Sequence, residues 1–165
     1  MARYATNIES AAAIVATAPT GATANALFAN LNASATAGYK LRRVTLGVIA
    51  GTGAPTSQQV SVGFVRTTAR GTATTTLTPS KLDPGSPAAA ITGLDTAWST
   101  VPTATWTPPY LYQVTFNSQS GVDLPFELLE EMVCAIGVAN GIAFINLDNA
   151  LPASHKLTLT CEHEE

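Results

Sequence analysis

Charged residues are scarce in this chain of 165 amino acids. Only 12% of the residues are Asp, Glu, Lys or Arg, about half the share of an ordinary soluble domain. The eight Lys and Arg residues are scattered and the net charge is −3, so there is no concentrated basic patch of the kind that displaces counterions from nucleic acid. We therefore predict no nucleic-acid partner. Arg42 and Arg43 are adjacent, but neighbouring side chains on a strand point to opposite faces.

Long apolar runs are missing as well. No stretch approaches the roughly 20 residues that a membrane-spanning helix needs, which predicts no membrane partner. The segment "AAAIVATAPTG" (residues 11–21) has the short apolar stretch and small residues of an export signal. Glu9 stands where such a signal carries positive charge, so we expect a protein that stays in the cytoplasm in which it is made.

Cysteine and histidine number two each. Two cysteines exclude a disulfide framework, and a single Cys134–Cys161 bond stays open. Cys161 and His163 share one face of a strand, as two zinc ligands would. A second close pair of ligands with finger or ribbon spacing is lacking. We predict no metal and no cofactor.

Motifs of catalysis are also absent. The sequence has no G-x-S-x-G elbow, no phosphate-binding loop and no H-E-x-x-H, and "GTGAPT" (residues 51–56) lacks the setting of a dinucleotide fingerprint. A pairing of Cys161 with His155 as nucleophile and base is the remaining alternative. The chain is predicted not to be an enzyme, and no catalytic residue is assigned.

What the sequence does contain is two-residue alternation between Gly- and Pro-rich breaks, which predicts half-buried strands. The clearest runs are "LRRVTLGVI" (41–49), "QQVSVGFVR" (58–66), "RGTATTTLTP" (70–79), "YLYQVTF" (110–116) and "HKLTLTCEHEE" (155–165). "YATNIESAAAIV" (4–15) adds a first strand with Tyr4, Thr6 and Ile8 on one side. We predict an all-β fold: one domain spanning residues 1–165, an antiparallel β-sandwich or jelly roll of about seven or eight strands with little helix.

Two connections are unusually long. Residues 17–38 are of low complexity and have only Leu27, Phe28 and Leu31 as anchors, which predicts a helical turn or a draped arm; residues 1–38 as a whole are predicted to be an N-terminal strand or arm. Residues 82–108 are rich in proline and hold both tryptophans, Trp98 and Trp106. Loops of this length usually serve a function or rest on a neighbour.

Four of the eleven acids lie between Asp123 and Glu131. The carboxylates of an acid/base site generally come from separate elements, whereas these come from one segment. We interpret "DLPFELLEE" (123–131) as one short helical turn whose acids keep a sheet edge soluble. Next, Asn140-Gly141 between "MVCAIGV" and "IAFIN" predicts a β-hairpin.

Five segments within roughly residues 40–165 carry a resemblance to a known family: "TTARGTATTTLTPSKLDPGSPAA", "DTAWST", "PPYLYQVTFNSQSGVDLPFELLEE", "NGIAFIN" and "ALPASHKLTLTCEHEE". Together they resemble small virion structural proteins of tailed bacteriophages, in particular capsid decoration (cement) proteins. The resemblance implies a β-sandwich that sits as a homotrimer on the capsid exterior of the virion, after synthesis in the host cytoplasm. The implied partners are the major capsid protein and further copies of the chain. No functional residue is carried over.

For such a role the candidate contact residues are Arg3, Tyr4, Ile8, Trp98 and Trp106. We expect deletion of residues 2–16 to abolish capsid binding and to leave a folded sandwich. One alternative is a carbohydrate-binding module in which Tyr110, Tyr112 and the two tryptophans stack against sugars. Another is a tail or fibre component with the same fold, which the sequence does not separate from a capsid protein.

Overall fold

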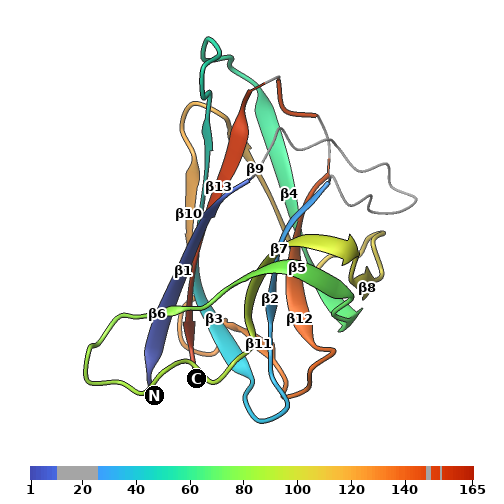
Figure 1. Ribbon diagram of the computed structural model, residues 1–165. Helices are drawn as coiled ribbons and strands as arrows, with labels where there is room; N and C mark the ends of the chain where they lie inside the picture. Colours follow the sequence, from blue (N-terminus) through green and yellow to red (C-terminus); the bar gives the residue numbers. More distant parts are fainter. Residues whose placement is uncertain (11–25, 148–149, 153) are drawn as a thin grey trace.

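The chain folds as a β-sandwich (Figure 1). The computed structural model describes residues 1–10, 26–147, 150–152 and 154–165, which form thirteen strands in two antiparallel sheets. This confirms the predicted all-β class, and no helix occurs in the described ranges. The strands outnumber the seven or eight predicted, partly because several are short edge pieces of two to four residues.

The first sheet has six strands and contains both ends of the chain. Its order is β10-β3-β13-β1-β6, and β11 also pairs with β3. The bounds are β1 (Arg3–Glu9), β3 (Tyr39–Ile49), β6 (Ser80–Lys81), β10 (Val122–Pro125), β11 (Met132–Cys134) and β13 (Lys156–Glu164). The N-terminal and C-terminal strands lie side by side in the middle of this sheet (Figure 1).

The second sheet has seven strands in the order β5-β7-β2-β12-β4-β8, with β9 also paired to β4. The bounds are β2 (Leu27–Asn32), β4 (Gln59–Ala69), β5 (Thr72–Leu77), β7 (Gly93–Thr100), β8 (Thr103–Ala104), β9 (Tyr112–Asn117) and β12 (Gly141–Asn146). Every residue of β2 and of β12 is buried, so these two strands form the centre of the sandwich.

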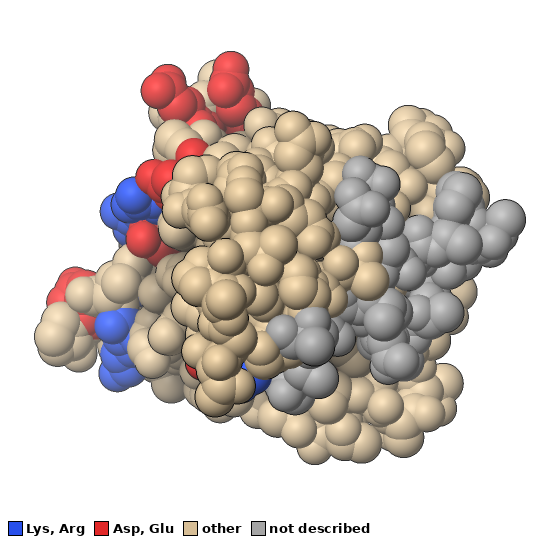
Figure 2. Space-filling view, turned by 90° about the horizontal axis from the view of Figure 1, so that it is seen from above, with Lys and Arg blue, Asp and Glu red and all other residues tan. Residues whose placement is uncertain are grey.

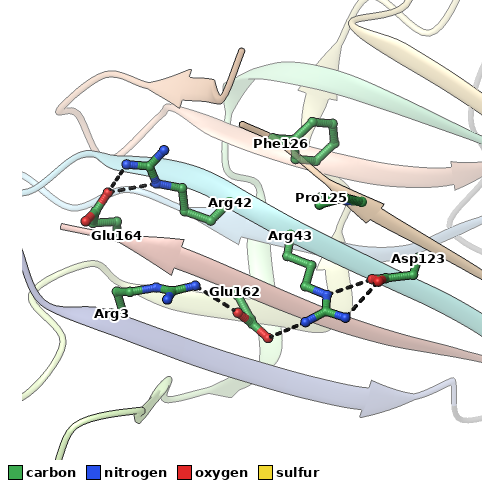
Figure 3. A pocket seen from close by; sticks show the side chains of 8 residues that line it. All are labelled: Arg3, Arg42, Arg43, Asp123, Pro125, Phe126, Glu162 and Glu164. Carbon is green, nitrogen blue, oxygen red and sulfur yellow. Dashed lines mark hydrogen bonds and ion pairs between the residues drawn. The ribbon is translucent and has the colours of Figure 1, made fainter. Parts of the chain in front are cut away.

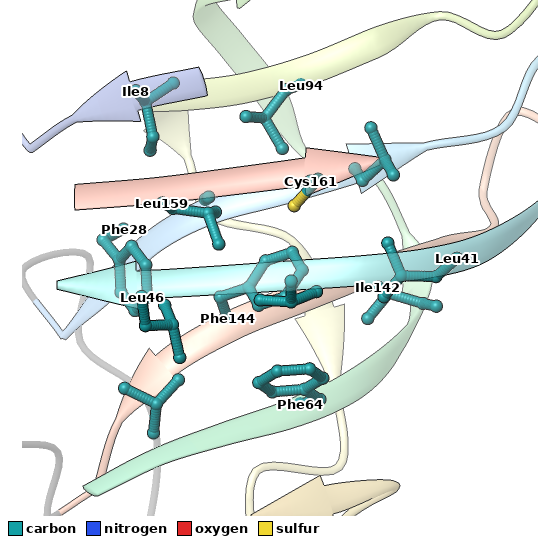
Figure 4. Close-up of a cluster of buried hydrophobic side chains, with 14 of the residues drawn as sticks. Ile8, Phe28, Leu41, Leu46, Phe64, Leu94, Ile142, Phe144, Leu159 and Cys161 are labelled. Atoms are coloured by element: carbon teal, nitrogen blue, oxygen red, sulfur yellow. The ribbon is translucent and has the colours of Figure 1, made fainter. Parts of the chain in front are cut away.

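The core lies between the sheets and follows the predicted alternation. On β13, Leu157, Leu159 and Cys161 point inward while the residues between them are more exposed. Phe64 and Phe144 from the second sheet meet edge to face, with ring centroids 4.8 Å apart (Figure 4). β1 likewise buries Tyr4, Thr6 and Ile8, as predicted for a first strand. Burial of this apolar surface is the main stabilising contribution to the sandwich.

Residues 27–32 correct the predicted helical turn or arm, because they form the central strand β2. The prediction failed because both faces of β2 are buried, which removes the alternation of apolar and polar residues that reveals a strand. Phe28 and Leu31 face the core between the sheets, whereas Leu27 joins a smaller cluster with Val65 and Ile145. Residues 11–25, which include the whole export-like segment 11–21, lie outside the described residues.

The predicted loop at 82–108 is also partly wrong. Residues 93–100 form β7, which pairs with β2 and β5, and residues 103–104 form β8. Gly93 opens β7 with a φ of 122°, and a Cβ at this position would lie 2.4 Å from the Leu77 carbonyl oxygen. A glycine that looked like a loop residue is therefore needed for close approach of two strands.

The predicted hairpin at Asn140-Gly141 does not form. β11 belongs to the first sheet and β12 to the second, so residues 135–140 cross from one sheet to the other. The Asn140 side chain donates hydrogen bonds to the carbonyls of Ala135 (3.2 Å) and Ile136 (2.9 Å) and so closes the crossing. A Cβ on Gly141 would lie only 2.7 Å from Asn30 Oδ1. Here Gly serves close strand packing and not a turn.

Candidate interaction surface

The outer face of the first sheet carries a ladder of paired charges. Arg43 makes two hydrogen bonds to Asp123, Nε to Oδ1 and Nη2 to Oδ2, both of 2.7 Å (Figure 3). Its Nη1 lies 3.9 Å from Glu162, which also accepts from Arg3 at 3.2 Å. These four residues line one shallow hollow, and within it each charge already has an opposite partner.

A β-bulge places Arg42 and Arg43 on this same face. Glu162 of β13 stands opposite Arg43 and His163 stands opposite Leu41, so Arg42 is the extra residue. The bulge interrupts the alternation and corrects the expectation that the two arginines point to opposite faces. Arg42 donates to Glu164 from Nε at 2.8 Å and lies 3.2 Å from Glu131.

Two of the four acids at 123–131, Asp123 and Glu131, are paired with the basic residues of β3. Hydrogen bonds from Arg43 and Thr45 lower the pKa of Asp123. The pKa of Glu131 is lowered too, first by its own backbone N–H and then by Lys40 and Arg42. Acid/base catalysis needs two carboxylates whose pKa values are pushed apart, whereas both of these are held in the ionised form.

The remaining two acids lie on a protruding turn. Residues 127–130, called the edge turn below, connect β10 to β11, and the Glu130 N–H donates to the Glu127 carbonyl (3.0 Å). This is a single turn without helix, so the predicted helical turn at 123–131 is wrong: its first three residues belong to strand β10 (Val122–Pro125). Leu128 is 69% exposed and Leu129 is 91% exposed.

Three further exposed apolar side chains, Val133, Ile136 and Val138, follow the edge turn. Val133 and Ile136 line a mostly apolar hollow together with Met1 and Lys40. A monomeric surface usually carries apolar side chains singly, and a group of them marks a contact site. Sequence reasoning missed this group because its residues were interpreted as half of a buried hairpin.

The five predicted contact residues lie in three different settings. Arg3 belongs to the charged ladder. Tyr4 is 1% exposed and Ile8 is 9% exposed, so neither side chain is accessible to a partner in this fold. Trp98 and Trp106 pack on the smaller cluster on the second sheet, with Tyr110 beside them.

The outcome predicted for deletion of residues 2–16 must be corrected as well. β1 is hydrogen-bonded to β13 on one side and to β6 on the other. Its removal would take Tyr4 and Ile8 out of the core, so the expected outcome is loss of the fold and not of binding alone.

The sugar-stacking platform of the alternative hypothesis is not assembled as one surface. The Tyr112 ring packs against Phe64 at 5.6 Å and against Phe126 at 5.8 Å. Trp98, Trp106 and Tyr110 belong instead to the smaller cluster.

Cys134 and Cys161 are both buried free thiols, which answers the open question of a disulfide. Burial raises the pKa of Cys161 well above its usual value, which disfavours the thiolate that a nucleophile or a zinc ligand needs. Cys161 and His163 share the inner face of β13, as predicted. No three His, Cys, Asp or Glu side chains in the described parts of the chain gather closely enough to hold a metal ion.

Comparison of the chain with family models, with curated proteins and with solved structures finds no match. Among the residues that the structure describes, no helix is long and apolar enough to cross a membrane.

Proposed function

We propose that this chain is a structural protein of a tailed-phage virion that decorates and stabilises the outer surface of the capsid. The identity of the partner, the major capsid protein, rests on the resemblance of residues 40–165 to phage decoration proteins. Support from the fold comes from a broad surface suited to non-covalent contact.

The observation that carries the proposal is an uncharged flank, residues 96–122, which includes β8, β9 and the loop between them. These residues contain no Asp, Glu, Lys or Arg. Thr103, Thr105 and Thr107 are exposed, followed by Pro108 and Pro109. Figure 2 shows the charged side chains gathered at one side of the molecule, away from most of the surface in view.

Burying such a flank under another protein costs little free energy. Burying an ion in an interface carries a desolvation penalty that must be offset by a partner charge, and the flank has no ion to bury. Pro loses little side-chain entropy when it is ordered. A modest contact is sufficient, because a homo-oligomer, expected to be a trimer, combines several weak sites into one strong attachment.

Co-sedimentation with undecorated capsids tests the proposal. We expect the unmodified chain to pellet with capsids of the phage that encodes it. Thr107→Arg, which puts a charge on the exposed flank, should reduce the bound fraction severalfold. Asn7→Arg is the matched control, because Asn7 is exposed on the outer face of β1 in the first sheet and should bind as the unmodified chain does.

Failure of the unmodified chain to bind capsids would overturn the proposal. If the isolated protein instead bound a glycan array, the carbohydrate-binding alternative would replace it. Gold-labelled antibody that marked only the tail of intact particles would reassign the chain to a tail or fibre component.

A further inference from the structure

The first sheet ends in two open edges of different chemistry. One edge consists of β10 and β11, which both pair with β3, and of the edge turn that connects them; the opposite edge is β6, which pairs with β1 (Figure 1). An open strand edge offers unpaired backbone groups and is a template for pairing with another chain. The side chains at the two edges indicate what kind of chain would pair there.

The edge turn retains a leucine where glycine would fit better. Leu129 has a φ of 76°, in the left-handed region that is costly for a side chain with a Cβ. Ser154 (φ 68°) is the other non-glycine residue at positive φ in the described part of the chain, whereas glycine occupies the positive-φ positions 51, 71, 93, 121 and 137. A leucine that is both strained and 91% exposed gains nothing from its own fold, so we infer that its contact lies outside the chain.

The edge turn is also negatively charged. Glu127 and Glu130 flank the two leucines, are exposed, and have no Lys or Arg within ion-pairing distance among the described residues. Asp123 and Glu131 on either side of the turn are both paired. The turn thus has an apolar centre and an unpaired acidic rim.

The opposite edge has the complementary character. Lys81 of β6 is exposed and forms no ion pair with a carboxylate in the part of the chain that the structure describes. Leu82, which follows, is 48% exposed, and Pro84 and Pro87 are exposed in the next loop. Asp83 is the one acid here, and its Oδ1 accepts a hydrogen bond from the Gly85 N–H at 2.9 Å.

We propose that copies of this chain associate head to tail through these two edges. Leu128 and Leu129 of one copy pack on Leu82 and the adjacent prolines of the next, and the acids of the edge turn pair with Lys81. A two-fold contact between two edge turns would bring four unpaired carboxylates together, which is unfavourable. A head-to-tail contact closes into a ring when the rotation between copies allows it.

This inference deepens the homo-oligomer of the proposed function, and its test needs no capsid. The variants are Lys81→Glu, the double change Glu127→Lys with Glu130→Lys, and all three changes together. Sedimentation velocity over a concentration series measures association at about 0.05 M and about 0.5 M salt, between which charge screening differs strongly. Circular dichroism and thermal unfolding check that each variant is folded.

We expect each single-edge reversal to weaken association by about tenfold or more at low salt, and the chain with all three changes to recover it. Leu128→Ser with Leu129→Gly should weaken association at both salt concentrations, because the lost contact is apolar. Asn7→Arg on β1 should have no effect.

Three outcomes would overturn the inference: an unmodified chain that stays monomeric at all concentrations, edge reversals without effect, or a triple variant that does not recover. Capsid binding by a monomeric chain would leave the proposed function in place and remove only this contact. Association of the chain without capsid binding would leave the head-to-tail contact in place and remove the proposed function.

Discussion

The two sheets share one core, but their outer sides differ in charge. In the described residues the first sheet carries seven of the eight ion pairs between Lys or Arg and a carboxylate, spread across β10, β3, β13 and β1. The second sheet carries one, between Arg70 and Asp95. The number of ion pairs is nevertheless a poor guide to stability, because an exposed pair contributes little and a buried one is costly to break.

The single pair of the second sheet is built into the fold. The Asp95 carboxylate is fully buried and accepts from Arg70 Nε and Nη2, both at 2.7 Å, and from Asn32 Nδ2 at 2.8 Å. Arg70 Nη2 also donates a hydrogen bond to the Thr76 hydroxyl at 2.9 Å. Removing this carboxylate would leave several donors without an acceptor.

The largest expected effect therefore follows from Asp95→Ala. The buried amide of Asn32 would lose an acceptor and the guanidinium of Arg70 its counter-charge, so we expect the free energy of unfolding to fall by roughly 3 kcal/mol. Urea titration followed by tryptophan fluorescence measures the change. A loss below about 1 kcal/mol, the range of surface pairs, would contradict the distinction between the two sheets.

The next effect concerns the inner face of the first sheet. His163 is fully buried between the rings of Tyr4 (5.4 Å) and Tyr39 (5.7 Å), and its Nε2 lies 3.3 Å from Glu165. Burial lowers its pKa, and Glu165 offsets only part of this effect. Because the folded state prefers neutral His163, its contribution is complete above the unfolded pKa of about 6.5 and declines as the pH falls from that value towards the lowered pKa of the folded state.

We expect the free energy of unfolding to decrease between pH 7 and pH 5.5 with a slope of up to about 1.4 kcal/mol per pH unit. Chemical denaturation at a series of pH values measures it. His163→Phe should flatten this part of the profile. An unmodified chain whose stability does not change over the same range would contradict this, because it would show that His163 binds a proton as readily in the folded chain as in the unfolded one.

A smaller change in stability is expected for a substitution in the edge turn, which lies beside the charged ladder. Leu129→Gly relieves a left-handed backbone costing about 1 kcal/mol, and the added chain entropy of glycine in the unfolded state offsets part of the gain. We expect the folded chain to become about 0.5 kcal/mol more stable while losing self-association. Thermal unfolding reports the first quantity, and destabilisation by more than 1 kcal/mol would show that Leu129 supports its own fold.

The smallest effect is expected for the ladder itself. Asp123→Ala breaks an exposed ion pair with Arg43, which keeps Glu162 as a neighbour. We expect only a marginal loss of stability, which decreases further at high salt because exposed pairs are screened. The same urea titration as for Asp95→Ala gives a direct comparison of the two sheets.

The strands that could be predicted from the sequence are mainly those with one face exposed to solvent. β3 and β13 were predicted because buried and more exposed side chains alternate along them. β4 was predicted from the alternation of Val60, Val62 and Phe64 with smaller residues, although Ser61 and Gly63 are buried as well. β2 was missed because it is buried on both faces, and the bulge at Arg42 was missed because it depends on β13, more than a hundred residues away. The edge turn was interpreted as helical because its acids and leucines suit a helix as well as a turn.

By itself, then, the sequence determined the fold class and the low charge of the surface, since strand alternation and composition are local properties of the chain. Only the tertiary structure decided which strands end each sheet, which acids remain unpaired, and that Leu128 and Leu129 face solvent. The physical reason is that a sheet edge and an ion pair both depend on which distant segments come together, and residues 40–46 meet residues 122–134 and 159–164 only after folding.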